Sequence, residues 1–147
     1  MPSEMRRAAR ALVESRLETF APESAPGPAR ERLERALARV GPPRAFVLAG
    51  RWSEREGRPV YDATFDPAPG TRRFLNGLSA VLVGLVAASA WALASEGAPA
   101  AARFLLPLAA GLGIVAMPLV VIGVATRREA EESRVRRAIR AALEEEA

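Results

Sequence analysis

The sequence predicts a mainly α-helical membrane protein in which two spanning helices form a hairpin between a small N-terminal α+β unit and a charged C-terminal helix. Two uncharged runs of 22 and 23 residues, one after Arg73 and one after Arg103, are the basis of this prediction. At about 1.5 Å per residue, each run can cross the roughly 30 Å hydrocarbon core of a bilayer. A soluble core helix rarely runs so far without a charge, and almost never twice in succession. We therefore expect spans at about residues 74–95 and 104–126.

The composition favours helices and disfavours most classes of enzyme. Half of the 147 residues are hydrophobic but only 5% are aromatic, so the apolar content is mostly Ala, Leu and Val. The chain has no His, Lys or Cys, which removes the usual general base, the Schiff-base amine and the thiolate nucleophile. Its basic residues are all Arg and are nearly balanced by acids, leaving a net charge of +4. We expect no catalytic site, no cofactor or metal, and no nucleic-acid partner.

Residues 1–70 predict a small cytoplasmic unit that begins with two amphipathic helices. In residues 3–20, apolar side chains recur on one side of a helix whose other side is charged. Residues 29–40 carry a second apolar stripe. Pro28 near its first turn and the stop at Gly41 delimit this second helix. The pattern predicts a helical hairpin with amphipathic faces.

After Gly41 the hydrophobic period changes from helical to alternating. Residues 45–52 and 60–65 each place large apolar side chains on one face of a strand, with a polar turn between them. Two strands alone are marginal in water, so this β-hairpin must lie on the helices, pair with another copy, or rest at the membrane surface. Carboxylates cluster near the turn with no metal-binding spacing, and we interpret them as a solvated turn and strand edge. They are Glu54, Glu56, Asp62 and Asp66.

The two uncharged runs are joined by residues 96–103, which can form little more than a turn. The spans are therefore expected to pair as an antiparallel transmembrane hairpin over residues 71–126, with both chain ends on one side of the bilayer. The outer flanks carry more arginine than the turn, so the positive-inside rule predicts an inner-membrane, multi-pass protein with both termini in the cytoplasm. The arginines that set this topology are Arg72, Arg73, Arg127 and Arg128.

Small residues recur every four positions in the first span, which lays them along one helix face. Such stripes let helix backbones approach closely in lipid, either within the hairpin or between copies of the chain. The predicted helix-packing residues are Asn76, Ala80, Gly84, Ala88 and Ala92 in the first span, with Ala109, Gly113 and Ala116 as a counterpart in the second. Asn76 lies only about 4.5 Å of helix rise beyond Arg73, so its amide can reach water or headgroups. We interpret it as the polar end of the stripe.

Pro118 lies within the second span, where its ring removes one backbone hydrogen bond. This position predicts a kink in the helix. Neither span contains an ionisable residue, and ionisable residues at depth usually mark transport pathways. The sequence therefore argues against an ion-coupled transporter.

Residues 127–147 predict a charged amphipathic helix that continues from the second span into the cytoplasm. Val135, Ile139 and Leu143 form a narrow apolar stripe along it. The glutamates at 144–146 place negative charge at a helix C-terminus, where the helix dipole disfavours it. Either this end frays or those carboxylates meet arginines elsewhere.

Three hypotheses about function follow from these patterns. The favoured one is a non-enzymatic accessory or scaffold subunit, whose cytoplasmic helices bind a partner protein or another copy of the chain while its spans pack in the lipid bilayer. The alternative is a small homo-oligomeric pore former, because two spans with both termini inside and charged tails resemble the layout of some phage holins. The third is a membrane-bound enzyme that uses carboxylates or hydroxyls, and no residue nominates its active site.

Overall fold

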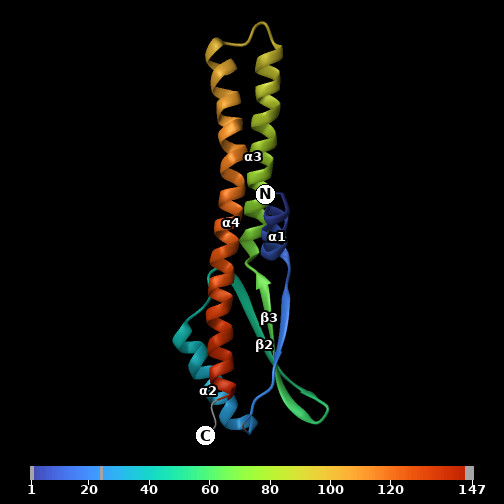
Figure 1. The fold of residues 1–147 in the computed structure, drawn as a ribbon, viewed down its shortest axis with the longest axis vertical. Coiled ribbons are helices and arrows are strands. Elements are labelled where there is room, and N and C mark those ends of the chain that lie inside the picture. The colour runs from blue at the N-terminus through green and yellow to red at the C-terminus, as the bar shows by residue number, and fades with distance from the viewer. Residues whose placement is uncertain (1, 24, 145–147) are drawn as a thin grey trace.

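The computed structural model describes residues 2–23 and 25–144, and within them the chain forms four α-helices and one three-stranded antiparallel sheet. A small α+β unit lies at one end, and a long helical hairpin projects from it (Figure 1). In chain order the elements are α1 (Pro2–Val13), β1 (Arg16–Phe20), α2 (Pro26–Val40), β2 (Phe46–Arg55), β3 (Arg58–Pro67), α3 (Pro69–Ala94) and α4 (Ala100–Glu144).

The predicted β-hairpin is confirmed, and its turn is shorter than expected. Strands β2 and β3 pair antiparallel until Arg55 lies opposite Arg58, so only Glu56 and Gly57 form the loop. Both loop residues have positive φ, 52° and 74°. Two positive φ values are typical of the two-residue turn whose twist matches that of the flanking strands. Gly57 adopts this conformation without steric cost.

The first predicted helix is too long, because residues 16–20 form strand β1 instead of a last helical turn. α1 ends at Val13, and β1 pairs antiparallel with β3, with Phe20 opposite Tyr61. The apolar spacing in this segment fits either a helix or a strand. Pairing with the otherwise open edge of β3 outweighs the local helix propensity. The sheet of the described residues therefore has the order β1-β3-β2 rather than two strands.

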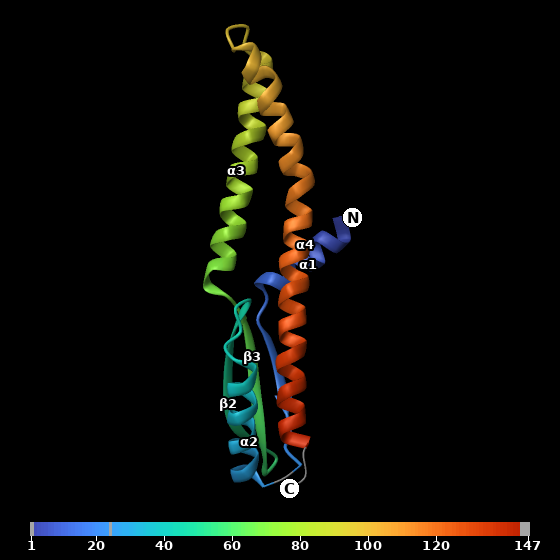
Figure 2. The ribbon, with the colours of Figure 1, turned by 90° about the vertical axis from the view of Figure 1, so that its left-hand side faces the viewer.

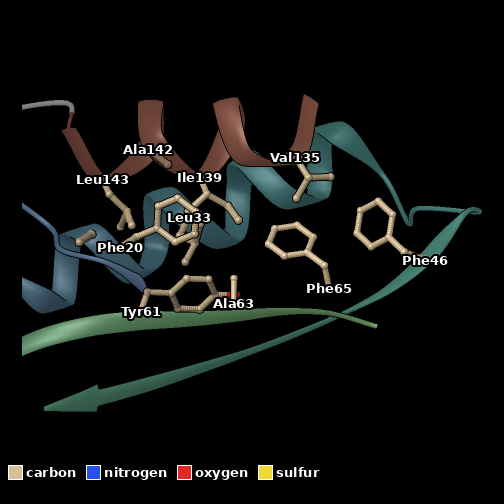
Figure 3. Close-up of a cluster of buried hydrophobic side chains, with 11 residues drawn as sticks. Phe20, Leu33, Phe46, Tyr61, Ala63, Phe65, Val135, Ile139, Ala142 and Leu143 are labelled. Carbon is tan, nitrogen blue, oxygen red and sulfur yellow. The ribbon is translucent and has the colours of Figure 1, made fainter. Parts of the chain in front are cut away.

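The core of the α+β unit lies between one face of this sheet and two helices, α2 and the C-terminal half of α4 (Figure 3). Phe46 and Phe65 meet with ring centroids 5.5 Å apart. The other sheet face stays open, since Leu17 is 63% exposed. The hairpin thus lies on the helices, the first of the three expected arrangements. The fully or nearly buried core residues are Phe20, Ala29, Leu33, Phe46, Tyr61, Ala63, Phe65, Val135, Ile139, Ala142 and Leu143.

The second predicted helix is confirmed as α2. It begins with Pro26, includes Pro28 in its first turn, and ends where the N–H of Gly41 donates to the carbonyl of Leu37 at 3.0 Å. Gly41 has a φ of 76°, a conformation that favours glycine after a helix end. Leu33 of α2 packs in the core, so this helix forms one wall of the unit.

The projecting hairpin consists of α3 and α4, which are long and apolar enough to cross a membrane by length and composition. As expected, α4 continues without a break from the second uncharged run into the charged C-terminal segment. Figure 2 shows this helix running along most of the height of the molecule, with α1 leaning away from it near the base of the hairpin. The predicted residues Glu145 and Glu146 lie outside the described residues.

Candidate membrane-facing hairpin and its junction with the α+β unit

The hairpin presents apolar side chains outward. In the most apolar 18-residue window of α3 and of α4, only 11% of residues are buried within the chain. Leu112 and Leu119 on α4 are each 64% exposed, and Val83 on α3 is 68% exposed. A soluble core helix would instead be mostly buried. Within these two windows, most side chains therefore lack partners from the described chain.

Three polar side chains of the hairpin donate hydrogen bonds to backbone carbonyls nearby. The hydroxyl of Ser89 donates to the carbonyl of Leu85 at 2.6 Å, and the hydroxyl of Thr126 donates to the carbonyl of Ile122 at 2.8 Å. At the tip, Arg103 donates to the carbonyls of Ser95 and Glu96, just after the end of α3, at 2.6 and 2.7 Å. Hydroxyls bonded back to the preceding helical turn need no water, which suits an apolar surrounding.

The structure brings together only part of the predicted small-residue stripe. Ala92 is buried and Ala88 is half-buried near the tip, whereas Asn76, Ala80 and Gly84 are exposed. On α4, Ala109 and Gly113 are half-buried and Ala116 is exposed. Gly113 lies close to α3, since a Cβ there would stand 2.9 Å from Leu82 Cδ1. The hairpin therefore closes on Gly113 and the tip alanines, and the first half of the stripe faces outward.

Pro118 and Pro107 both lie inside α4, which is helical on either side of each. A proline in a helix leaves the carbonyl four residues earlier without its N–H donor. For Pro118 that carbonyl belongs to Ile114. The kink expected at Pro118 stays a prediction.

Arg128 joins α4 to the α+β unit. Its side chain is buried, with the residue only 1% exposed. Its Nε donates to Glu132 Oε1 at 2.7 Å, and its Nη2 donates to the carbonyls of Glu14 and Phe65 at 3.1 and 3.2 Å. One guanidinium therefore links α4 to the chain just after α1 and to the last part of β3.

Two carboxylates of α4 complete this connection. Glu132, also 1% exposed, accepts from Arg128 and has Arg16 of β1 at 3.3 Å from its second oxygen. Glu131 Oε2 accepts from the backbone N–H groups of Arg44 and Ala45, at 3.1 and 3.0 Å, where the chain enters β2. Because β1 and β2 start where β3 ends, these contacts reach the same end of all three strands. We call Arg128, Glu131 and Glu132 the junction cluster.

The topology arginines occupy different surroundings. Arg72 and Arg73 at the start of α3 are exposed, as is Arg127 on α4, whereas Arg128 is buried in the junction cluster. The sequence did contain a signal for this burial. Arg128 and Glu132 continue, at spacings of three and four, the stripe formed by Val135, Ile139 and Leu143, so they lie on the same helix face as the core residues.

Asp62 in the central strand β3 links the two outer strands, β1 and β2, through its side chain. Its carboxylate accepts from the hydroxyls of Thr19 on β1 and Ser53 on β2, at 2.6 and 2.7 Å. These two hydrogen bonds, together with nearby Arg55, hold the pKa of Asp62 below its ordinary value. Burial raises the pKa of the neighbouring Tyr61 phenol. The Asp62 carboxylate thus links the three strands, and these hydrogen bonds give it a structural role.

Within residues 2–23 and 25–144, no group of three His, Cys, Asp or Glu side chains is placed to hold a metal ion. No protein-family model, curated protein or solved structure matches the chain. Function is therefore inferred from the apolar hairpin and the junction cluster.

Proposed function

We propose that the chain is a non-enzymatic, multi-pass protein of the inner (cytoplasmic) membrane that acts as an accessory or scaffold subunit. The hairpin of α3 and α4 crosses the bilayer, and the α+β unit and both termini lie in the cytoplasm. The exposed apolar surface of the hairpin supports insertion, because a contiguous surface of this kind drives association when it is left in water. The absence of His, Lys and Cys supports a role without catalysis.

The continuity of α4 is the single observation that carries this proposal. Residues 100–126 of this helix belong to the exposed apolar hairpin, and one face of residues 127–144 packs into the core of the α+β unit. The junction cluster lies where these two parts meet. No linker separates them, so the unit is held at a set distance and orientation from the bilayer. A rigidly held surface suits the presentation of a binding face better than a flexible tether does.

The outward-facing first half of the small-residue stripe supports contact between copies of the chain. Among the described residues, no atom lies within 4 Å of a Cβ built on Gly84, outside its own helix and chain neighbours. A leucine at Gly84 should therefore leave the single hairpin intact and lower the dimer fraction in detergent, measured by native mass spectrometry. Ala90→Leu is the matched control, because Ala90 is an exposed small residue of α3 that lies about 120° around the helix from Gly84. Equal dimer fractions in both variants would argue against packing through the stripe.

The membrane topology can be tested with single cysteines, because the chain contains none. Gly97 lies at the hairpin tip, and Ser133 lies on the exposed side of α4 beside the α+β unit. An impermeant maleimide should label Gly97→Cys from outside intact cells, and Ser133→Cys only after the membrane is opened. Labelling of both cysteines from the same side would contradict the proposed hairpin.

The scaffold role predicts an assembly. After extraction in mild detergent, the full-length protein should migrate as a homo-oligomer or with a specific partner, while expression leaves the membrane potential intact. A monomeric species without a partner would contradict the scaffold role. Collapse of the membrane potential on expression would contradict it as well and would favour the pore-forming alternative.

A further inference from the structure

Helix α1 packs against the base of the hairpin. Leu12 is 1% exposed and forms a small buried cluster with Val121 and Ala125 of α4, with Leu75 of α3 at its edge. Leu75 and Ala125 lie at the cytoplasmic ends of the proposed spans. α1 leans outward from α4 at this level (Figure 2). An amphipathic helix at this depth lies where headgroups meet acyl chains.

A second face of α1, beside its contact with α4, carries positive charge. Arg6, Arg7 and Arg10 are all exposed. Among the described side chains, none of the three takes part in an ion pair. By contrast, Arg128 and Arg16, which are close by, are both paired with Glu132. The free charges on α1 are therefore available to a ligand.

A groove runs between α1 and α4, and it has a polar part and an apolar part. The polar part, about 560 Å³, is lined by Ser3, Arg6, Arg7, Arg10, Ala11, Glu14, Arg16 and Glu129. The adjoining hollow, about 350 Å³, is lined by Arg7, Ala8, Ile122, Ala125, Thr126 and Glu129. The two share Arg7 and Glu129 in their walls, and the second continues along α4 toward the exposed apolar surface of the hairpin.

We propose that this groove binds an anionic phospholipid of the cytoplasmic leaflet. The lipid phosphate lies among Arg6, Arg7 and Arg10, and the start of an acyl chain lies along Ile122 and Ala125. Arginine forms charge-assisted hydrogen bonds with phosphate oxygens. Among the described side chains that line the polar part, four arginines face two carboxylates, so these residues favour a net negative headgroup. The inference rests on the proposed insertion of the hairpin.

The competing occupant is a zwitterionic lipid. Glu14 and Glu129 could meet the ammonium of phosphatidylethanolamine while the arginines meet its phosphate. A direct competition between phosphatidylglycerol and phosphatidylethanolamine therefore separates the two. Because each arginine near an anionic surface strengthens binding by about fivefold, we expect a preference of at least about tenfold for phosphatidylglycerol.

Native mass spectrometry of the full-length protein in mild detergent, with the two lipids at equal concentration, measures this preference. The R6Q/R7Q/R10Q variant should retain both lipids about equally. The matched control R39Q/R51Q/R58Q removes the same charge from exposed arginines of α2, β2 and β3 that do not line the groove. This control should keep the wild-type preference. Equal retention of the two lipids by the wild type, or a preference for phosphatidylethanolamine, would overturn the proposal.

Two further measurements keep the test decisive. The first uses the wild type alone and so does not depend on whether the triple variant folds. Its preference for phosphatidylglycerol should fall with added salt, because screening weakens contacts between phosphate and arginine. A salt-independent preference would contradict the site. Displacement of phosphatidylglycerol by millimolar inorganic phosphate would assign the groove to a soluble anion instead. Resistance to alkaline extraction separately reports membrane insertion. If the protein resists extraction but shows no lipid preference, the lipid site is refuted and the proposed insertion is not.

Discussion

The two halves of α4 are parts of one helix, yet they bury their side chains in different ways. Between residues 100 and 126, large apolar side chains such as Leu112 and Leu119 stay exposed. Between residues 127 and 144, Ile139 is 0% exposed, and even the charged Glu132 is buried. The second half has a sheet and α2 to pack against, whereas the first half packs against α3 on one side and meets α1 only at its base. Apolar character alone therefore does not decide burial, because a partner surface must also be present.

The largest effect is expected at Glu132. Glu132→Gln should destabilise the α+β unit by about 3–5 kcal/mol, because it leaves Arg128 buried without its anionic partner. Thermal unfolding of the purified protein followed by circular dichroism measures this loss. Glu129→Gln is the control, since Glu129 is an exposed carboxylate on the same helix. Equal unfolding midpoints in the two variants would show that the junction cluster contributes little to stability.

The apolar contrast between the halves can be tested with one substitution in each. Ile139→Ala should cost about 2–5 kcal/mol, because it opens a cavity between the sheet and α4. Leu119→Ala shortens a side chain that is 64% exposed. It should leave the unfolding midpoint of the α+β unit unchanged, because it opens no cavity in the core. A comparable loss in both variants would mean that the two halves unfold as a single cooperative unit.

A charge placed on the hairpin tests its environment. Leu112→Arg should lower membrane insertion by about 2.5–3.5 kcal/mol, the cost of arginine near the centre of a spanning helix. The fraction of protein that resists alkaline extraction measures the effect. Ser133→Arg adds the same charge to an exposed position in the second half and should not change that fraction. If Leu112→Arg extracts like the wild type, residues 104–126 do not span the bilayer.

The smallest expected effect concerns pH. Asp62 has a lowered pKa in the folded protein, so its charged form contributes stability that is present above the ordinary pKa of about 4 and is lost as pH falls through the lowered value. Asp62→Asn should therefore lower the unfolding midpoint at pH 7 and reduce its further fall on acidification. Glu54→Gln, an exposed carboxylate of β2, should keep the wild-type pH profile. The same profile in both variants would contradict the role of the Thr19 and Ser53 hydrogen bonds.

Local patterns in the sequence were enough to predict α2, the β-hairpin and the two apolar helices, because each has its own period and end signals. Glycine after α2 and two positive-φ residues in the hairpin turn agree with those predictions. Strand β1 could not be predicted in this way, since its stability comes from pairing with β3, a distant segment of the chain. The three-stranded sheet is therefore a result of long-range pairing.

The candidate site likewise has features that local sequence predicts and features that depend on contacts between distant segments. The uncharged runs and their flanking arginines are properties of the sequence, and they predicted that two long apolar helices follow one another in the chain. Helical spacing puts Arg128 on the face of the core residues, but only the tertiary structure decided that its guanidinium meets the carbonyls of Glu14 and Phe65. Only the tertiary structure decided also that Gly113 rather than Gly84 meets the neighbouring helix. The physical reason is that charge and residue size act locally, whereas burial and close approach depend on which surfaces of distant segments come together.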